Sequence, residues 1–438
     1  MNVMKAEIEV MKNSEKYCAL VFDEMSLERG LYYSASKQEI SGFQDLGRLG
    51  RSNVHANHAL VFMVRGIHKS WKQVVAYYFT HTSVSSITLK SLITYVIRQL
   101  QEIGLKVVCT VCDQGATNQR ALKELCCEKS TESSPFHFVV RDEPIAVIYD
   151  VPHILKNTRN ALLGNKISLG LKQRPVLNIF TGLFFWISRF KVAATQLSHT
   201  VAAVIETYVA FNILPAEAIY TAEFVEKMDC LFDSLNSFCC YPQDGKSYMC
   251  VLSAESPHIE MWYSLLQETE NWKVLELGTG RDKTNMFSFI SGWQTTIRSL
   301  MFIWNQLKKG FNFLSMRAFN QDPVENVFCC VRQHGVPNTN PTCFQFKAVL
   351  KTVIVNNMSL PTKSLGNCED DRCMPLSNLR QFLGASDDNF LDSTIDHSII
   401  DQSDLHCALA DNEAAAGSGG ADVRNDRQAL AYVAGYIL

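Results

Sequence analysis

The sequence has no overall excess of positive charge. Its 438 residues include 41 lysines and arginines against 44 aspartates and glutamates, which gives a formal net charge of −3 at pH 7. Proteins that hold nucleic acids mainly by charge are usually basic. Any polyanionic partner must therefore be held by local basic patches, or by a module outside this sequence.

Long hydrophobic runs are also missing. The first residues lack the apolar core of a secretory signal peptide, and the most apolar stretch, 179–194, is interrupted by Arg189 and Lys191 well short of a membrane span. We therefore expect no membrane association and no secretion. With 47% hydrophobic residues the chain can bury a large core, and its length suggests two or three domains.

Metal-binding and phosphate-binding sequence frames are absent as well. The 15 cysteines are odd in number and form no CxxC…CxxC frame, so we expect buried, reduced thiols of an intracellular protein. The glycines at 278 and 280 lack the lysine and the hydroxyl residue of a P-loop. The sequence has no internal repeats either.

The N-terminal part has the pattern of an α/β domain. Predicted strands span 17–23, about 30–35, 59–65, 73–80 and 105–112, with a helix over 88–103 before the last of them. The helix prediction rests on apolar residues at helical spacing from Leu89 to Ile103, followed by Gly104 as a stop signal. Setting aside the short segment near 30–35, this is a βββαβ order. A further strand, 145–149, leads into a helix starting near His153.

The pattern changes between about 164 and 315 to long apolar stretches at helical spacing. These are 176–190, 196–212, 221–239 and 285–308. We predict a large all-helical insertion that interrupts a mixed α/β sheet domain. The predicted domains are 1–163, the first part of the α/β domain; 164–315, the insertion; 316–358, the second part; 359–427, an acidic flexible linker; and 428–438, the start of a truncated C-terminal region.

Three carboxylates stand where a metal-dependent site needs them. Asp23 and Asp113 are predicted at strand ends, and Glu325 near the start of a helix over 323–334 that opens with Pro323. Hard cations such as Mg²⁺ prefer oxygen ligands, and two of them about 3.5 to 4 Å apart activate an attacking oxygen while stabilising the leaving one. This predicts phosphodiester cleavage or joining.

Each of these carboxylates also has a structural interpretation. A strand-end aspartate such as Asp23 or Asp113 often caps the turn or helix that follows it. Glu325 fits a capping box in which Asp322 is the N-cap residue. Asp150, at the end of the strand 145–149, is a fourth such carboxylate, and for it we favour the cap over a catalytic role.

Several strings resemble the P-element transposases and the related THAP-domain-containing proteins derived from them. The resemblance covers roughly residues 10–355. The strings are Val21-Phe-Asp-Glu-Met, Val111-Cys-Asp-Gln-Gly-Ala-Thr-Asn, Tyr149-Asp-Val-Pro-His-Ile-Leu-Lys-Asn, Lys191-Val-Ala-Ala-Thr-Gln and Asn320-Gln-Asp-Pro-Val-Glu-Asn.

The resemblance implies an RNase H-like catalytic domain interrupted by a helical GTP-binding insertion. It implies that Asp23, Asp113 and Glu325 form the metal-binding triad of a DDE-type DNA transposase, with two Mg²⁺ or Mn²⁺ ions. It also implies that GTP is a bound cofactor rather than a fuel. The implied nucleotide contacts are Lys191, Val192, Phe232, Asp233 and Asn236, with Asp322 beside the catalytic glutamate.

The resemblance further implies partners and a location. The expected substrates are double-stranded transposon ends and target DNA, bound by a homo-oligomer in the nucleus. The family's zinc-coordinating THAP domain is expected to be missing, because Asp23 lies almost at the start of the sequence. The alternative is a catalytically inactive, host-domesticated nuclear protein that keeps the fold and interacts with DNA or protein.

Overall fold

The central strands are buried along most of their length. In the computed structural model, the stretch from Cys18 to Phe22 in strand β1 (Tyr17–Ser26) is fully buried. Such continuous apolar runs are typical of strands covered on both faces. The structure describes residues 2–34, 38–127, 136–169, 174–176, 197–242, 245–334, 337–355 and 373–375.

The main sheet is mixed and has the strand order β5-β4-β7-β6-β1-β8-β10-β9, with β16 paired to β7 off this path. Its strands are β4 (Phe43–Asp45), β5 (Arg51–His55), β6 (His58–Gly66), β7 (Trp71–Thr80), β8 (Lys106–Cys112), β9 (His137–Val140), β10 (Glu143–Tyr149) and β16 (Met374–Pro375), in addition to β1. The predicted strands near 17–23, 59–65, 73–80, 105–112 and 145–149 are therefore confirmed.

The chain divides into two compact units. Unit 1 comprises Met1–Phe22, Val64–Ser70 and Ser85–Gln321, and unit 2 comprises Asp23–Met63, Trp71–Val84 and Asp322–Leu438. In unit 1, β1 and β8 run parallel with Val21 opposite Val111, and β10 runs parallel to β8 with Tyr149 opposite Cys112. Three strands therefore present their carboxyl ends at one edge of the sheet.

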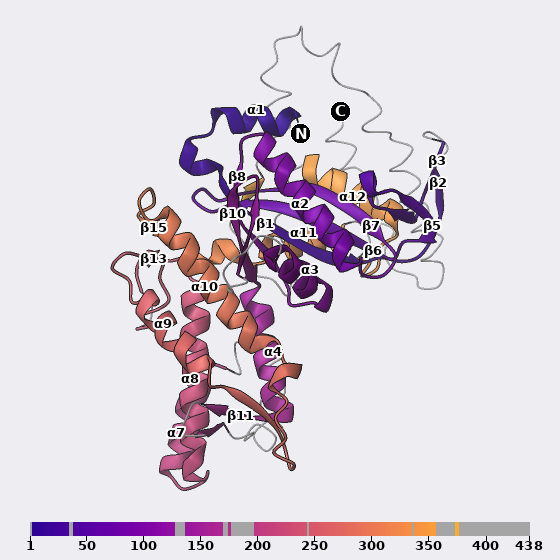
Figure 1. Ribbon diagram of the computed structural model, residues 1–438. Helices are drawn as coiled ribbons and strands as arrows, with labels where there is room; N and C mark the ends of the chain where they lie inside the picture. Colours follow the sequence, from indigo (N-terminus) through magenta and orange to yellow (C-terminus); the bar gives the residue numbers. More distant parts are fainter. Residues whose placement is uncertain are drawn as a thin grey trace, which may run out of the picture. The chain divides into compact units, whose positions relative to one another are not determined.

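Helices α1 (Asn2–Val10), α2 (Ser86–Glu102), α3 (Ala116–Cys127) and α4 (Val151–Gly164) belong to unit 1. Helix α2 begins where the Ser85 side chain accepts a hydrogen bond from Thr88 N, and its apolar stripe is buried. Gly104 follows it at φ +92°, a conformation that favours glycine. Helix α3 lies beside α2 (Figure 1) and was not predicted, because its polar residues weaken the helical pattern.

The segment 164–315 is mostly helical. Its helices are α7 (His199–Ala210), α8 (Ile219–Leu235), α9 (His258–Thr269) and α10 (Phe289–Leu307). Figure 1 shows α7 and α8 side by side, and α10 packs on β10, α4 and α9. Polar side chains link these layers: Trp293 Nε1 of α10 donates to Thr158 Oγ1 of α4 at 3.0 Å.

The prediction that this segment is all-helical was wrong in detail. Strands β11 (Asn165–Leu169), β12 (Arg174–Val176) and β14 (Lys273–Glu276) form a three-stranded antiparallel sheet, and β13 (Leu252–Ser253) pairs with β15 (Phe313–Leu314). These strands are two to five residues long, too short for an alternating pattern to be recognised. The predicted stretch 176–190 lies almost entirely outside the described residues.

Unit 2 carries the hairpin of β2 (Tyr32–Ser34) and β3 (Glu39–Ser41) and the helices α11 (Asp322–Gln333) and α12 (Cys343–Val355). Phe346 of α12 packs edge-on against Tyr77 and Phe79 of β7, with ring centroids 5.8 and 5.9 Å apart. Short 3₁₀ helices in the two units span Asn13–Lys16, Gly47–Leu49, Ala216–Ala218, Thr284–Met286 and Met316–Phe319.

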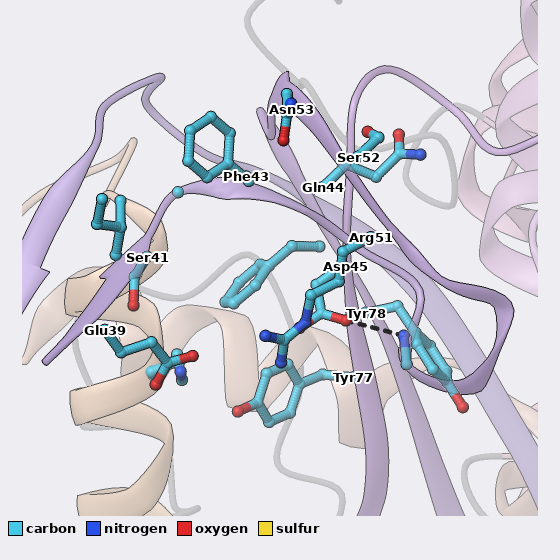
Figure 2. A pocket seen from close by; sticks show the side chains of 15 residues that line it. Glu39, Ser41, Phe43, Gln44, Asp45, Arg51, Ser52, Asn53, Tyr77 and Tyr78 are labelled. Carbon is cyan, nitrogen blue, oxygen red and sulfur yellow. Dashed lines mark hydrogen bonds and ion pairs between the residues drawn. The ribbon is translucent and has the colours of Figure 1, made fainter. Parts of the chain in front are cut away.

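A cavity of about 340 Å³ opens in unit 2, between the β3–β5 region, β7 and Lys347 of α12. Figure 2 shows Asp45 and Arg51 close to Tyr77 on its wall, and Arg51 Nε lies 2.9 Å from Asp45 Oδ2. None of the residues predicted to bind metal or nucleotide lines this cavity.

The cysteines are only partly as expected. Cys18, Cys109, Cys126 and Cys343 are buried, and burial raises the pKa of the Cys343 thiol to about 11. Cys127 and Cys240, in contrast, are exposed. The predicted linker 359–427 and the segment 428–438 lie outside the described residues except for 373–375. The proposed domain boundaries stay a prediction.

Candidate catalytic site

Asp23 lies inside β1 rather than at its end. The strand continues to Ser26, so the prediction that Asp23 terminates it was wrong. Its side chain is half-buried, and Oδ1 accepts a hydrogen bond from Glu24 N at 2.8 Å. Because the strand runs on, Asp23 does not cap a following turn, and that structural interpretation is lost for this residue.

Asp113 directly follows β8, as predicted. Its Oδ1 accepts hydrogen bonds from Gly115 N at 2.9 Å and from Asn118 Nδ2 at 2.6 Å, so it does hold the turn that leads into α3. Both bonds go to the same oxygen. The cap and a metal-binding role for Oδ2 are therefore compatible.

Within unit 1, the register of β1 and β8 is fixed up to the residues before the two aspartates. Val21 of β1 is opposite Val111 of β8 in a parallel pair. Asp23 and Asp113 each follow two residues later in the sequence. Asp113 lies just beyond β8 in unit 1 and Asp23 begins the first segment of unit 2, so a metal site shared by the two carboxylates stays a prediction.

Asp150 is a structural residue, as the sequence favoured. Its side chain is 2% exposed and forms the N-cap of α4, with Oδ2 accepting from His153 N at 3.1 Å and from His153 Nδ1 at 2.8 Å. Its other oxygen, Oδ1, accepts from Gln321 N at 2.8 Å. Its own N–H donates to the carbonyl of Cys112 at 2.8 Å. The carboxylate therefore ties α4 to two distant segments.

Gln321 completes this chain of hydrogen bonds. Its side chain is 1% exposed, and its Nε2 donates to the carbonyl of Phe22 at 3.0 Å. Phe22, Cys112 and Gln321 immediately precede Asp23, Asp113 and Asp322 in the sequence. Within unit 1, the Asp150 network thus fixes the main chain just before each segment that carries a predicted catalytic carboxylate.

Sequence reasoning did not single out Gln321 as a site residue, although it lies in the recognised string from Asn320. Asn320 is also 1% exposed, and its Oδ1 accepts from Arg65 Nη1 at 2.8 Å. The signal available in the sequence was two consecutive amide residues, Asn320 and Gln321, just before a predicted helix with acidic residues in its first turn. Buried amides are retained where they satisfy specific partners.

Gln114 links the loop after Asp113 to helix α10. Its side chain is 8% exposed, and Nε2 donates to the carbonyl of Ser288 at 2.8 Å. A Cβ atom on Gly292 would lie 2.3 Å from Nε2 of Gln114, so only glycine permits this approach. The backbone carbonyl of Gln114 in turn accepts from Gln119 Nε2 at 2.6 Å.

Glu325 lies in the first turn of α11 and is half-buried. Asp23 and Glu325 belong to unit 2, whereas Asp113 belongs to unit 1, so the convergence of the three carboxylates stays a prediction. Across the described part of the chain, no group of three or more His, Cys, Asp or Glu side chains is placed to hold a metal ion.

The predicted nucleotide contacts are only partly described. Lys191 and Val192 lie outside the described residues. Phe232 and Asp233 are half-buried on α8, and Asn236 ends that helix, where its Oδ1 accepts from Asn320 Nδ2 at 3.3 Å. Asp322 opens α11 in unit 2.

Asp233 shares one lysine with a second carboxylate. Lys246 Nζ lies 2.7 Å from Asp233 Oδ2 and 3.0 Å from Asp229 Oδ2. Burial raises the pKa of Asp233, although the hydrogen bond from Lys246 opposes the shift. Burial lowers the pKa of Lys246, but the two carboxylates outweigh it and the net shift is upward. The positive charge of Lys246 is balanced by two carboxylates, whereas the two carboxylates share a single positive charge.

Comparisons with known proteins agree with this fold. Residues 1–126 match the TNP-like RNase H N-terminal domain and residues 318–351 match the TNP-like RNase H C-terminal domain. The structure is similar to that of the Drosophila P element transposase strand transfer complex, with a TM-score of 0.64, 22% identity, and coverage of 80% of this chain and 79% of that one. The RNase H-like fold class is therefore confirmed.

Two curated proteins extend the similarity along the chain. The Transposable element P transposase of Drosophila melanogaster is 25% identical over 376 residues, which are 80% of this chain and 46% of that protein. The DNA transposase THAP9 of Homo sapiens is 23% identical over 373 residues, which are 76% of this chain and 40% of that protein. The chain is thus similar to the P-element transposases and spans less than half the length of these two proteins.

The helices also bear on membrane insertion. Among those that the structure describes, none is both long and apolar enough to cross a bilayer.

Proposed function

We propose that the chain is the catalytic core of a P-element-type DNA transposase. It would hydrolyse a phosphodiester bond at a transposon end and then direct the freed 3′-hydroxyl at a phosphorus atom of target DNA. The observation that carries this proposal is the hydrogen-bond chain through Asp150. It orders the residues that precede Asp23, Asp113 and Asp322, which supports a site assembled from distant carboxylates.

The donor set suits two Mg²⁺ or Mn²⁺ ions, because hard cations prefer carboxylate oxygens. Asp23 and Asp113 would flank the ions, and Glu325 would hold the second. Asp113 can contribute Oδ2 while Oδ1 holds the following turn. When bound, such a pair of ions supplies an activated oxygen nucleophile and stabilises the leaving oxygen.

The remaining roles belong to positioning residues. Asp150 and Gln321 fix the main chain before the carboxylates, and Gln114 holds the loop after Asp113 against α10. Charge stabilisation in such a site depends on ligands that are oriented before the reaction. A buried, hydrogen-bonded support is the arrangement that provides this orientation.

GTP is proposed as a bound cofactor of the helical segment. Asp233 would accept the two hydrogen bonds offered by the guanine Watson–Crick edge, and Phe232 would provide a stacking face. Lys191, Val192, Asn236 and Asp322 are the other proposed contacts. The hydrogen bond from Lys246 to Asp233 supports the proposal, because it shows that this half-buried carboxylate accepts a donor group.

The proposed reaction also sets the partners and the location. Double-stranded transposon ends and target DNA are the substrates, and pairing of two ends favours a homo-oligomer on DNA. Such a protein would act in the nucleus. A DNA partner is supported by the similarity in fold to the P element transposase in a strand transfer complex.

A magnesium-dependent nicking assay on a DNA end tests the catalytic assignment. We expect Asp23→Asn to lower the rate by at least about two orders of magnitude, since a neutral amide removes a charged ligand from a site that acts by charge stabilisation. Asp142→Asn is the matched control, because Asp142 is exposed in the turn before β10 at φ +63°, which asparagine tolerates. Equal cleavage by wild type and Asp23→Asn would favour the non-catalytic alternative.

A further inference from the structure

Five lysines lie on the chain segments that meet in an aromatic cluster at the amino-terminal ends of β1 and β8. We call them the lysine face. Lys69, Lys106, Lys308 and Lys309 are exposed and Lys16 is half-buried. All five belong to unit 1.

The aromatic cluster brings the three lysine-bearing segments together. The rings of Tyr17 and Phe311 meet edge-on with centroids 5.4 Å apart, and the ring of His68 lies 5.0 Å from that of Phe311. Lys16, Lys69 and Lys309 each lie within two residues of one of these rings in the sequence. Lys106 is opposite Tyr17 in the sheet, with Nζ 4.8 Å from the Tyr17 ring centroid.

The backbone under these lysines is held in place. Phe311 is 5% exposed, and the turn that precedes it is closed by hydrogen bonds from Gly310 N and Phe311 N to the carbonyl of Leu307 at 2.8 and 3.0 Å. Ile67 N donates to the carbonyl of Tyr17 at 3.1 Å, which ties the turn before Lys69 to β1. The backbone positions that carry these lysines are therefore set by the fold.

Little negative charge offsets this face. Lys69 Nζ lies 3.6 Å from Glu15 Oε1. Among the described residues, this is the one ion pair that the five lysines form. Lys308 Nζ instead donates to the amide oxygen of Asn305 at 2.9 Å. In a chain of net charge −3, a local excess of exposed lysines forms a positive field that attracts polyanions.

The lysine face is distinct from the candidate catalytic site. β8 begins at Lys106 and ends just before Asp113, so its seven residues separate the two by roughly 20 Å. Lysines are compact point charges without the planar, bidentate fork of arginine. The chemistry therefore fits phosphate groups and carries no sequence preference.

We propose that the lysine face binds the phosphodiester backbone of double-stranded DNA as a second, sequence-independent DNA contact. The proposal rests on the proposed function in its choice of DNA as the polyanion. DNA held here would be at the end of β8 opposite Asp113. Target or flanking DNA could then be retained independently of the bond being cut.

The test measures binding of the full chain to a random-sequence DNA duplex by fluorescence anisotropy, in EDTA so that no cleavage occurs. The variant Lys106→Glu with Lys309→Glu is expected to bind at least about ten-fold more weakly. Its plot of log affinity against log salt should be less steep by roughly 2, because each lost phosphate contact accounts for about 0.9.

The matched control is Arg98→Glu with Lys123→Glu, which changes the net charge equally at exposed positions of α2 and α3. We expect it to bind nearly as wild type does. A second variant, Lys308→Gln with Lys309→Gln, removes charge without reversing it and should weaken binding by an intermediate factor. Equal losses in the two charge-reversal variants, unchanged binding in the lysine-face variants, or no binding by wild type would each overturn the proposal.

The proposal and the catalytic function fail separately. Asp113→Asn should abolish nicking while leaving binding in EDTA unchanged. Lysine-dependent binding by a chain that does not nick DNA would support the lysine face and count against catalysis. Normal nicking together with lysine-independent binding would count against the lysine face alone.

Discussion

At the scale of single residues, the carboxylates of this chain divide by what their oxygens already bind. Both oxygens of Asp150 are engaged inside the protein by three donor groups. Asp113 uses Oδ1 for the following turn. The sequence placed both at strand ends and favoured the cap for Asp150 alone, whereas the structure shows that Asp113 also holds the turn after it, because a cap and a metal ligand require the same residue at the same position.

Asp150→Ala should destabilise the fold and reduce nicking together. The substitution removes an N-cap and leaves the buried Gln321 N–H without its acceptor, which we expect to cost about 2 to 4 kcal/mol. Urea unfolding measures this cost, with Asp142→Asn as a carboxylate control. A stable Asp150→Ala protein would show that the hydrogen-bond chain does not hold the strand ends.

Asp233→Ala should abolish the selectivity of the full chain for GTP over ATP. Guanine presents two adjacent donors that adenine lacks, so losing the carboxylate should cost on the order of ten-fold in GTP affinity. Calorimetry with both nucleotides measures the effect. Asp229→Ala is the matched control, since Asp229 pairs with the same Lys246 one turn earlier. Equal affinity of the wild type for GTP and ATP would contradict the nucleotide assignment.

At the scale of elements, the segment 164–315 is coupled to the strand ends through helix α10. Thr296 Oγ1 accepts from Tyr149 N at 3.0 Å, and Gln114 reaches Ser288 at the start of the same helix. If a bound cofactor shifted α10, the movement would therefore reach the loop after Asp113 through these two hydrogen bonds. Such a link needs discrete packing rather than a continuous deformation.

Gly292→Ala should expose this coupling. The added methyl group would collide with Gln114 Nε2, and we expect a loss of about 1 to 3 kcal/mol from overpacking. Gln114→Ala removes the colliding amide, so the double variant should be more stable than the sum of the single effects predicts. A double-mutant cycle by urea unfolding measures this difference. Strict additivity would mean that the loop and α10 act independently.

The elements themselves were predictable to different degrees. Helix α2 and strands β1 and β8 have strong apolar patterns, and they were found with ends that differ by at most three residues. Helix α3 and strands β4, β5 and β11 were missed. Their patterns are weak or short, and they are stabilised by neighbours such as α2, β7 and β14 rather than by their own sequence.

At the scale of the whole molecule, the proposed reaction requires Asp23, Asp113 and Glu325 to meet within a few ångströms, because two ions share their ligands. A crystal structure with Mn²⁺ and DNA should show anomalous scattering between the three side chains. Asp113→Asn in the same crystals should weaken that signal. A structure that places Glu325 far from the two aspartates would leave it only the role of a helix cap.

The sequence by itself determined the RNase H-like class, the three candidate carboxylates and the relationship to P-element transposases, because local periodicity and short strings carry that information. Only the tertiary structure decided which residues support the site. The bond from Gln321 to Phe22 spans 299 positions and that from Gln114 to Ser288 spans 174. Such pairs follow from the sheet order and from the packing of α10, and no local rule encodes which distant amide a buried carbonyl will meet.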